Sequence, residues 1–155
     1  MDTTPKRTGA CLCGAVTYEI AGPARQVVAC HCSQCRKQSG HYVSATQVPM
    51  DALTIAGAEN LTWYAASDSA RRGFCKTCGS QLFWEPAGRA TMSIFAGTLD
   101  APTGLTTVAH IFVADKGDYY EIGDGPPQYD VTIAKDERAA MTAPTEPGGE
   151  SGSQE

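Results

Sequence analysis

The stretch from Ala29 to Gly40, ACHCSQCRKQSG, places three cysteines within six residues. Cys30, Cys32 and Cys35 offer soft sulfur ligands, and zinc in proteins takes four such ligands in a tetrahedron. Three protein ligands leave the fourth position to water or substrate, which is typical of a reactive metal site. The stretch therefore predicts a catalytic or labile zinc centre that is one ligand short.

Two cysteine pairs flank this stretch, CLCG at residues 11–14 and CKTCG at residues 75–79. In an extended CxC both side chains point the same way, and the glycine after each pair lets backbone amides turn toward the thiolates. Two pairs supply the four thiolates of a closed structural zinc shell. We expect this shell to consist of Cys11, Cys13, Cys75 and Cys78, and two zinc ions per chain; four buried free thiols are the alternative.

The three-cysteine stretch leaves other interpretations open. A histidine could complete it as a second structural zinc, and the chain offers His31, His41 and His110. His31 lies between two ligands, so on an extended segment its side chain points away from the metal. His110 shares strand parity with Val108 and Phe112, which favours a core histidine. A redox disulfide within the stretch would leave the third thiol unpaired.

Charge favours a thiol as the fourth ligand. Three thiolates give a Zn²⁺ centre a net charge of −1 and weaken it as an activator of water. Such a centre is well suited to holding another thiol as thiolate. Arg36 and Lys37 could receive the carboxylates of that thiol, or they could be ordinary solvated charges. The proton could pass through water or a hydroxyl such as that of Ser33 or Ser39.

Composition indicates one globular domain in a reducing compartment. Of 155 residues, 42% are hydrophobic and 19% charged, which fits a folded chain. Seven cysteines cannot pair off completely, and the polar N-terminus lacks the apolar centre of a signal peptide. We therefore expect a cytoplasmic protein. The sequence contains no run of about 18 apolar residues, so it predicts no membrane-spanning helix. The net charge of −5 argues against nucleic acid as a partner.

Short alternating segments predict a mainly β fold with one or two helical turns. One strand follows a turn at Gly14, and a helical turn near residues 33–39 closes at Gly40. The remaining strand candidates are residues 26–29, 41–48, 53–55, 61–65, 70–74, 81–85, 91–96 and 107–113. Residues 1–7 are expected to be a flexible leader, 8–134 a zinc-binding domain, and 135–155 a disordered acidic tail rich in Pro, Gly, Ser and Glu.

The motifs GACLCGAVTYE, CHCSQCRKQSG and FCKTCGSQLF, in this order, resemble the glutathione-dependent formaldehyde-activating enzyme family, which includes centromere protein V. The resemblance runs from about Gly9 to Tyr129 and includes HIFVADKGDYYEIGDGPPQYD. It implies a β-tent fold of stacked antiparallel sheets, structural zinc on the two pairs, and catalytic or labile zinc on the three-cysteine stretch.

The activity that the resemblance implies joins glutathione and formaldehyde to S-(hydroxymethyl)glutathione. The expected function is thus a zinc-dependent carbon–sulfur lyase or synthase acting on a small thiol and a small aldehyde. The alternative is a non-catalytic zinc module that binds or senses a thiol such as glutathione, or binds a protein partner. A nucleic-acid or microtubule role like that of centromere protein V is disfavoured, because the chain is acidic and has no basic tail.

Overall fold

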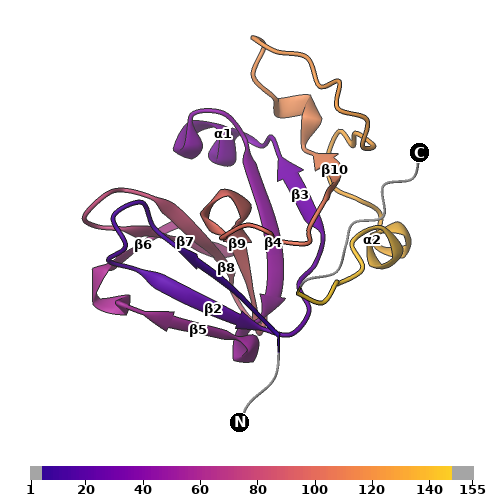
Figure 1. Ribbon diagram of the computed structural model, residues 1–155. Coiled ribbons are helices and arrows are strands. Elements are labelled where there is room, and N and C mark those ends of the chain that lie inside the picture. Colours follow the sequence, from indigo (N-terminus) through magenta and orange to yellow (C-terminus); the bar gives the residue numbers. More distant parts are fainter. Residues whose placement is uncertain (1–4, 148–155) are drawn as a thin grey trace.

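Two β-sheets pack against each other in the structure, a computed structural model that describes residues 5–147 (Figure 1). The small sheet has the order β1-β2-β5 and the large sheet the order β10-β3-β4-β9-β8-β7-β6. The small sheet consists of β1 (Lys6–Ala10), β2 (Thr17–Ala21) and β5 (Leu53–Ala56). The large sheet consists of β3 (Val27–Cys30), β4 (Val43–Pro49), β6 (Leu61–Ser67), β7 (Ala70–Cys75), β8 (Gln81–Pro86), β9 (Thr91–Phe95) and β10 (Thr107–Ile111).

Helical structure is limited to short pieces, so the predicted mainly β fold of stacked sheets with short helical turns is confirmed. The two α-helices are α1 (Ser33–Ser39) and α2 (Lys135–Met141). The 3₁₀ turns are η1 (Met50–Ala52), η2 (Ala58–Asn60), η3 (Ala96–Thr98) and η4 (Val113–Asp115). No helix among residues 5–147 is both long and apolar enough to cross a membrane.

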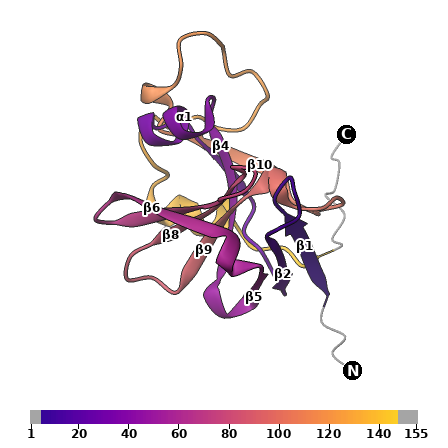
Figure 2. The same ribbon diagram turned by 90° about the vertical axis from the view of Figure 1, so that its left-hand side faces the viewer.

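The main core lies between the two sheets (Figure 2). Along β2 the inward residues Tyr18 and Ile20 are buried while Thr17 and Glu19 are exposed, which is the alternation expected of a strand with one face on a core. They meet Phe83 and Ile94 from the large sheet. The rings of Tyr18 and Phe83 contact edge to face with centroids 5.4 Å apart, a favourable arrangement for aromatic pairs.

One strand pairing differs from the expected antiparallel sheets. Each predicted strand overlaps an observed one, but β10 runs parallel to β3, with Ile111 beside Cys30. After β9 the chain returns to the far edge of the large sheet and enters it in the direction of β3. The carboxyl ends of β3 and β10 are therefore neighbours. The segment that follows β10 consequently lies close to the three-cysteine stretch that follows β3 (Figure 1).

The expected leader is wrong for Lys6 and Arg7, which belong to β1. Arg7 is buried, and its guanidinium donates to the carbonyl oxygens of Thr103 (2.7 Å) and Thr145 (3.0 Å). These partners explain why a charged residue near the chain start is ordered. Residues 1–4 of the expected leader lie outside the described residues.

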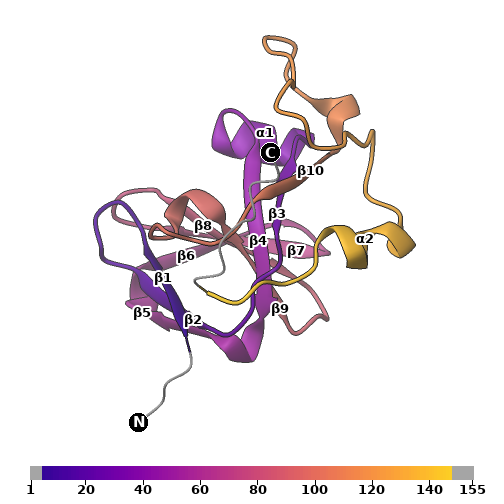
Figure 3. The same cartoon turned by 45° about the vertical axis from the view of Figure 1, so that its right-hand side comes forward.

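The expected disordered tail is also wrong for residues 135–147. Helix α2 packs beside β3 and β10 (Figure 3), where Ile133 and Met141 contact Val28 and Ala109. Farther on, Thr145 exchanges two backbone hydrogen bonds with Ala24, at 3.1 and 2.9 Å. Single apolar residues thus anchor a segment whose average composition is that of a disordered one. Residues 148–155 lie outside the described residues, and the domain boundaries themselves stay a prediction.

Candidate metal centres

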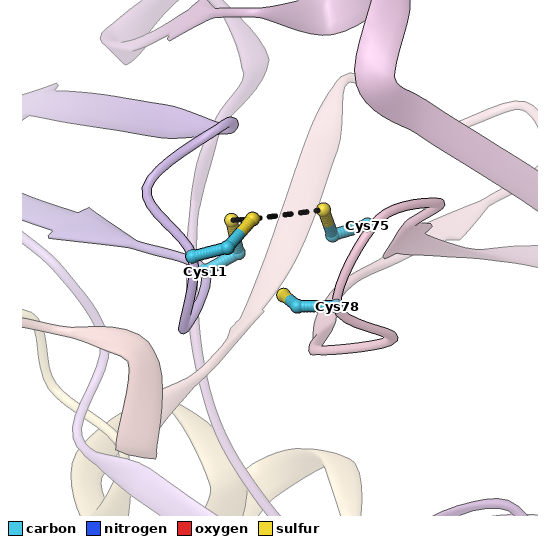
Figure 4. Close-up of side chains that lie close together, drawn as sticks. Cys11, Cys75 and Cys78 are labelled. Atoms are coloured by element: carbon cyan, nitrogen blue, oxygen red, sulfur yellow. Dashed lines mark hydrogen bonds between the residues drawn. The ribbon is translucent and has the colours of Figure 1, made fainter.

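The two cysteine pairs come together at one place, between the small sheet and the end of β7 (Figure 4). Cys11 and Cys13 lie in the turn after β1, Cys75 ends β7, and Cys78 lies in the turn after it. The four sulfur atoms are all within 4.8 Å of one another. The structure therefore assembles the set that the sequence predicts.

In each turn the glycine amide bonds back to the carbonyl of the first cysteine, three residues back in one turn and four in the other. Gly14 donates its amide to the Cys11 carbonyl (3.1 Å) and Gly79 to the Cys75 carbonyl (2.8 Å). Both glycines have positive φ, 79° and 78°, a conformation that side chains disfavour. Ser80 joins the two turns, because its hydroxyl accepts the Leu12 amide at 2.9 Å.

The four sulfurs fit a zinc ion. Four sulfurs at about 2.3 Å from a tetrahedral zinc lie about 3.8 Å apart, and here Cys11 Sγ is 3.6 Å and Cys75 Sγ 3.8 Å from Cys13 Sγ. Hydrogen bonds from the Ser80 hydroxyl and amide, and from the Cys13 backbone, lower the pKa of Cys78 to about 5. This four-cysteine cluster could hold zinc with no open position.

The second cluster, which we call the three-cysteine centre, spans the junction of β3 and α1. Cys30 ends β3, Cys32 is the N-cap of α1 and Cys35 lies in its first turn. Their sulfurs are also within 4.8 Å of one another. Helix α1 ends at Gly40, whose φ of 86° gives the left-handed cap that the sequence predicts.

Thiol crowding favours one ionised sulfur in the three-cysteine centre. Thiol hydrogen bonds from Cys30 and Cys35 lower the pKa of Cys32 to about 2. Cys30 shows the converse: its hydrogen bonds with Cys32 and Cys35, and then burial, raise its pKa. A cation at the centre removes this competition, since zinc keeps coordinated thiols deprotonated. The donor set therefore fits zinc, with three protein ligands.

No histidine nitrogen of residues 5–147 lies in either sulfur cluster. The side chain of His31 turns away from the sulfurs, as expected, and is buried in a chain of hydrogen bonds. Its Nδ1 contacts the Tyr120 hydroxyl and its Nε2 lies 2.9 Å from His110 Nδ1. His110 Nε2 in turn lies 2.9 Å from Asp124 Oδ1. Both ring nitrogens of each histidine are thus occupied, which confirms His110 as a satisfied core histidine.

The environment of His31 keeps its ring neutral. Burial, followed by the charges of His110 and His41, lowers the pKa of His31 to about 4. A neutral ring donates through one nitrogen and accepts through the other. Its two partners therefore fix the ring and, with it, the backbone between two of the sulfurs.

The expected thiol-carboxylate contacts, Arg36 and Lys37, lie on α1 at the edge of the three-cysteine centre. Arg36 Nε donates to the Asp115 carbonyl at 3.2 Å, which leaves the rest of its guanidinium available. Lys37 is exposed, with no ion pair among residues 5–147. Of the two suggested hydroxyls, that of Ser39 donates to the Cys35 carbonyl at 2.7 Å, so its proton is already in use.

One charged residue beside the three-cysteine centre was missed from the sequence. Arg72 on β7 is buried, and its Nη2 lies 3.5 Å from Cys35 Sγ. The sequence pattern does indicate a buried position for Arg72, because strand parity puts it on the same inward side as the buried Ala70. A charged residue at an inward strand position indicates a specific partner.

The chain is similar to known proteins over most of its length. A family model described as glutathione-dependent formaldehyde-activating enzyme matches residues 6–115. An uncharacterised lyase of Schizosaccharomyces pombe (strain 972 / ATCC 24843) is 30% identical over 124 residues, which cover 77% of this chain and 88% of that protein.

Among solved structures, the crystal structure of a Rhodobacter sphaeroides protein has the same fold. Its TM-score is 0.54 at 22% identity, over 78% of this chain and 98% of that one. The family model spans both sulfur clusters and most of the two sheets. The chain therefore belongs to the glutathione-dependent formaldehyde-activating enzyme family.

Proposed function

We propose that the protein is a zinc-dependent carbon–sulfur lyase or synthase that acts on the adduct of a small thiol and a small aldehyde. Glutathione and formaldehyde, which give S-(hydroxymethyl)glutathione, are the substrates that the family name suggests. The observation that carries the proposal is the difference between the two centres: one offers four sulfurs, the other three sulfurs and no histidine nitrogen among residues 5–147.

In this proposal Cys30, Cys32 and Cys35 hold the catalytic zinc, and the four-cysteine cluster holds a structural one. Zinc held by these three cysteines would supply a fourth position where a thiol ionises at neutral pH. Arg36 and Lys37, at the edge of the centre, attract the carboxylates of the thiol and orient it. Helix α1 and the buried His31 keep the three sulfurs in place while substrates exchange.

The reaction needs little more than positioning. The sulfur forms a bond to the aldehyde carbon, and the carbonyl π bond opens to a C–O single bond. The proton lost by the thiol reaches that oxygen through water. The reverse breaks the C–S bond and returns thiol and aldehyde. Holding the reactants together replaces a bimolecular encounter, the usual source of acceleration when chemistry is otherwise easy.

Zinc lability provides the first test. We expect two zinc ions per chain by native mass spectrometry, one of which becomes labile to chelators when glutathione is added. Cys32→Ser should remove the labile ion and leave the other, so the four-cysteine cluster serves as an internal control. Two equally inert zinc ions in the wild-type protein would contradict an open position.

Turnover provides the second test. Exchange between ¹³C-formaldehyde and S-(hydroxymethyl)glutathione can be followed by NMR with wild-type protein, with Cys32→Ser and without protein. We expect acceleration by the wild type alone. A rate no faster than the uncatalysed one, together with tight glutathione binding, would replace the proposal with the thiol-binding module that turns nothing over.

A further inference from the structure

Arg72 is a buried cation without a carboxylate partner among residues 5–147. Only 3% of the residue is exposed, and its Nε and Nη1 are buried with no hydrogen-bond acceptor in the described part of the chain. Its neighbour Arg71 is an ordinary surface residue: it pairs with Glu85 and lies 4.1 Å over the Trp63 ring. Two adjacent arginines of one strand thus have opposite surroundings.

The charge of Arg72 is directed at the three-cysteine centre. A guanidinium stays protonated inside a protein, so burying it without an anion is strongly unfavourable. Among the described residues its hydrogen-bond contacts are Cys35 Sγ and the neutral Gln34 Oε1, both 3.5 Å from Nη2. Cys35 is the one of these that can carry a negative charge.

We propose that Arg72 is the buried counter-ion of the three-cysteine centre. Three thiolates and one Zn²⁺ sum to −1, and the guanidinium brings the local charge to zero. An anionic fourth ligand binds more favourably when the guanidinium brings the local charge to zero than it would at a centre of net charge −1. Arg72 therefore raises the affinity of the centre for zinc and favours a thiolate over a neutral ligand such as imidazole.

This proposal rests on the proposed function only where it concerns the fourth ligand. The zinc affinity follows from the three cysteines and Arg72, whatever reaction takes place. The zinc affinity also distinguishes a counter-ion from a residue that only stabilises the fold. A buried charge without an anionic partner is itself costly. While the three-cysteine centre is free of zinc, replacing Arg72 by an apolar side chain of similar volume should therefore cost no stability, and the cost should appear in metal binding.

Zinc competition against a chromophoric chelator tests the first half, using Arg72→Met, Arg72→Lys and the matched surface control Arg71→Met. We expect Arg72→Met to weaken zinc binding at the three-cysteine centre about 10- to 100-fold, the usual effect of losing a group that supports a ligand. Arg72→Lys should retain most of the affinity, and Arg71→Met should match wild type. The zinc of the four-cysteine cluster should be unchanged throughout.

The same variants, loaded with one zinc per chain, are then unfolded in urea. Arg72→Met should be at least as stable as wild type. An unchanged zinc affinity in Arg72→Met would overturn the proposal, as would a loss of stability with no change in zinc binding. Arg72→Gln replaces Arg72→Met if that variant fails to fold, and the same criteria apply to it.

Ligand titration of the zinc-saturated protein tests the second half. In Arg72→Met we expect glutathione to bind at least tenfold more weakly and imidazole to bind as in wild type. Equal losses for the two ligands would overturn the preference for an anion. Formaldehyde is absent from every one of these measurements, so a lack of turnover would count against the proposed function alone.

Discussion

Replacing His110 with Phe tests whether the hydrogen-bond chain behind the three-cysteine centre acts as a unit. His110 is buried, with Nδ1 2.9 Å from His31 Nε2 and Nε2 2.9 Å from Asp124. Phenylalanine has a similar shape but no nitrogen. The substitution therefore leaves the fully buried His31 with one ring nitrogen that has no partner.

The expected cost follows from the two bonds that are lost. A buried polar group without a partner costs about 1–3 kcal/mol. The contact with Asp124 adds less, about 0.5 kcal/mol, because half of that carboxylate side chain (51%) is exposed. The two contributions together lower the free energy of unfolding by about 2.5 kcal/mol.

Urea unfolding at saturating zinc measures this loss, and His41→Phe is the matched control. His41 is exposed, and its Nδ1 contacts the Tyr119 hydroxyl at 2.6 Å, also at the surface. We expect His41→Phe to change the free energy of unfolding by less than about 0.5 kcal/mol, as is usual at surface positions.

The double variant His31→Phe/His110→Phe decides whether the reasoning is right. When both rings are replaced, no histidine nitrogen is left without a partner. The loss of unfolding free energy in the double variant should therefore be at least about 1 kcal/mol smaller than the sum of the losses in the two single variants. Single costs that add within about 0.5 kcal/mol would refute a coupled chain. A His110→Phe variant as stable as wild type would refute it as well.

Three further predictions concern the core, the tail and the four-cysteine cluster. Ile133→Ala should lower the free energy of unfolding in urea by about 2–4 kcal/mol, because Ile133 is buried. Val131→Ala, at an exposed position, should lower it by less than about 0.5 kcal/mol. Equal effects of the two substitutions would contradict an anchored tail. Burial raises the pKa of Tyr18 to about 12 from 10, so its contribution to stability is full below pH 10 and falls as pH rises toward 12. Relative to Tyr18→Phe, the wild-type protein should lose about 1.4 kcal/mol of unfolding free energy between pH 9 and 11. Parallel pH profiles of the two proteins would count against this. Cys75→Ser should release zinc and unfold the domain in circular dichroism, while Cys32→Ser should release zinc and keep the fold; a folded Cys75→Ser protein would show that the four-cysteine cluster is not structural.

Local patterns were enough to predict most of the strands and both sulfur clusters. The alternation of Tyr18 and Ile20 defines an inward face without reference to the rest of the chain. Gly40 ends α1 because its left-handed cap needs no distant partner. The cysteine spacings determine which sulfurs within one segment can reach the same ion, since each pair is held by a single turn.

Long-range contacts account for what was missed. Arg7 is ordered by carbonyls 96 and 138 residues away, and the His31–His110 contact joins residues 79 apart. The parallel pairing of β10 with β3 depends on where the chain re-enters the sheet. The inward position of Arg72 could be read from strand parity, but its contact with Cys35 depends on how β7 and α1 pack together.

The two centres also differ in when they can form during synthesis. The cysteines of the three-cysteine centre lie within six residues, so they leave the ribosome together and can take up zinc before most of the sheet exists. The four-cysteine cluster must wait, because Cys13 and Cys75 are separated by 62 residues, and closing so long a loop carries an entropic cost. Strands β2 to β7 are made in that interval. The nascent chain can therefore complete the three-cysteine centre first, and the four-cysteine cluster only once β7 has been made.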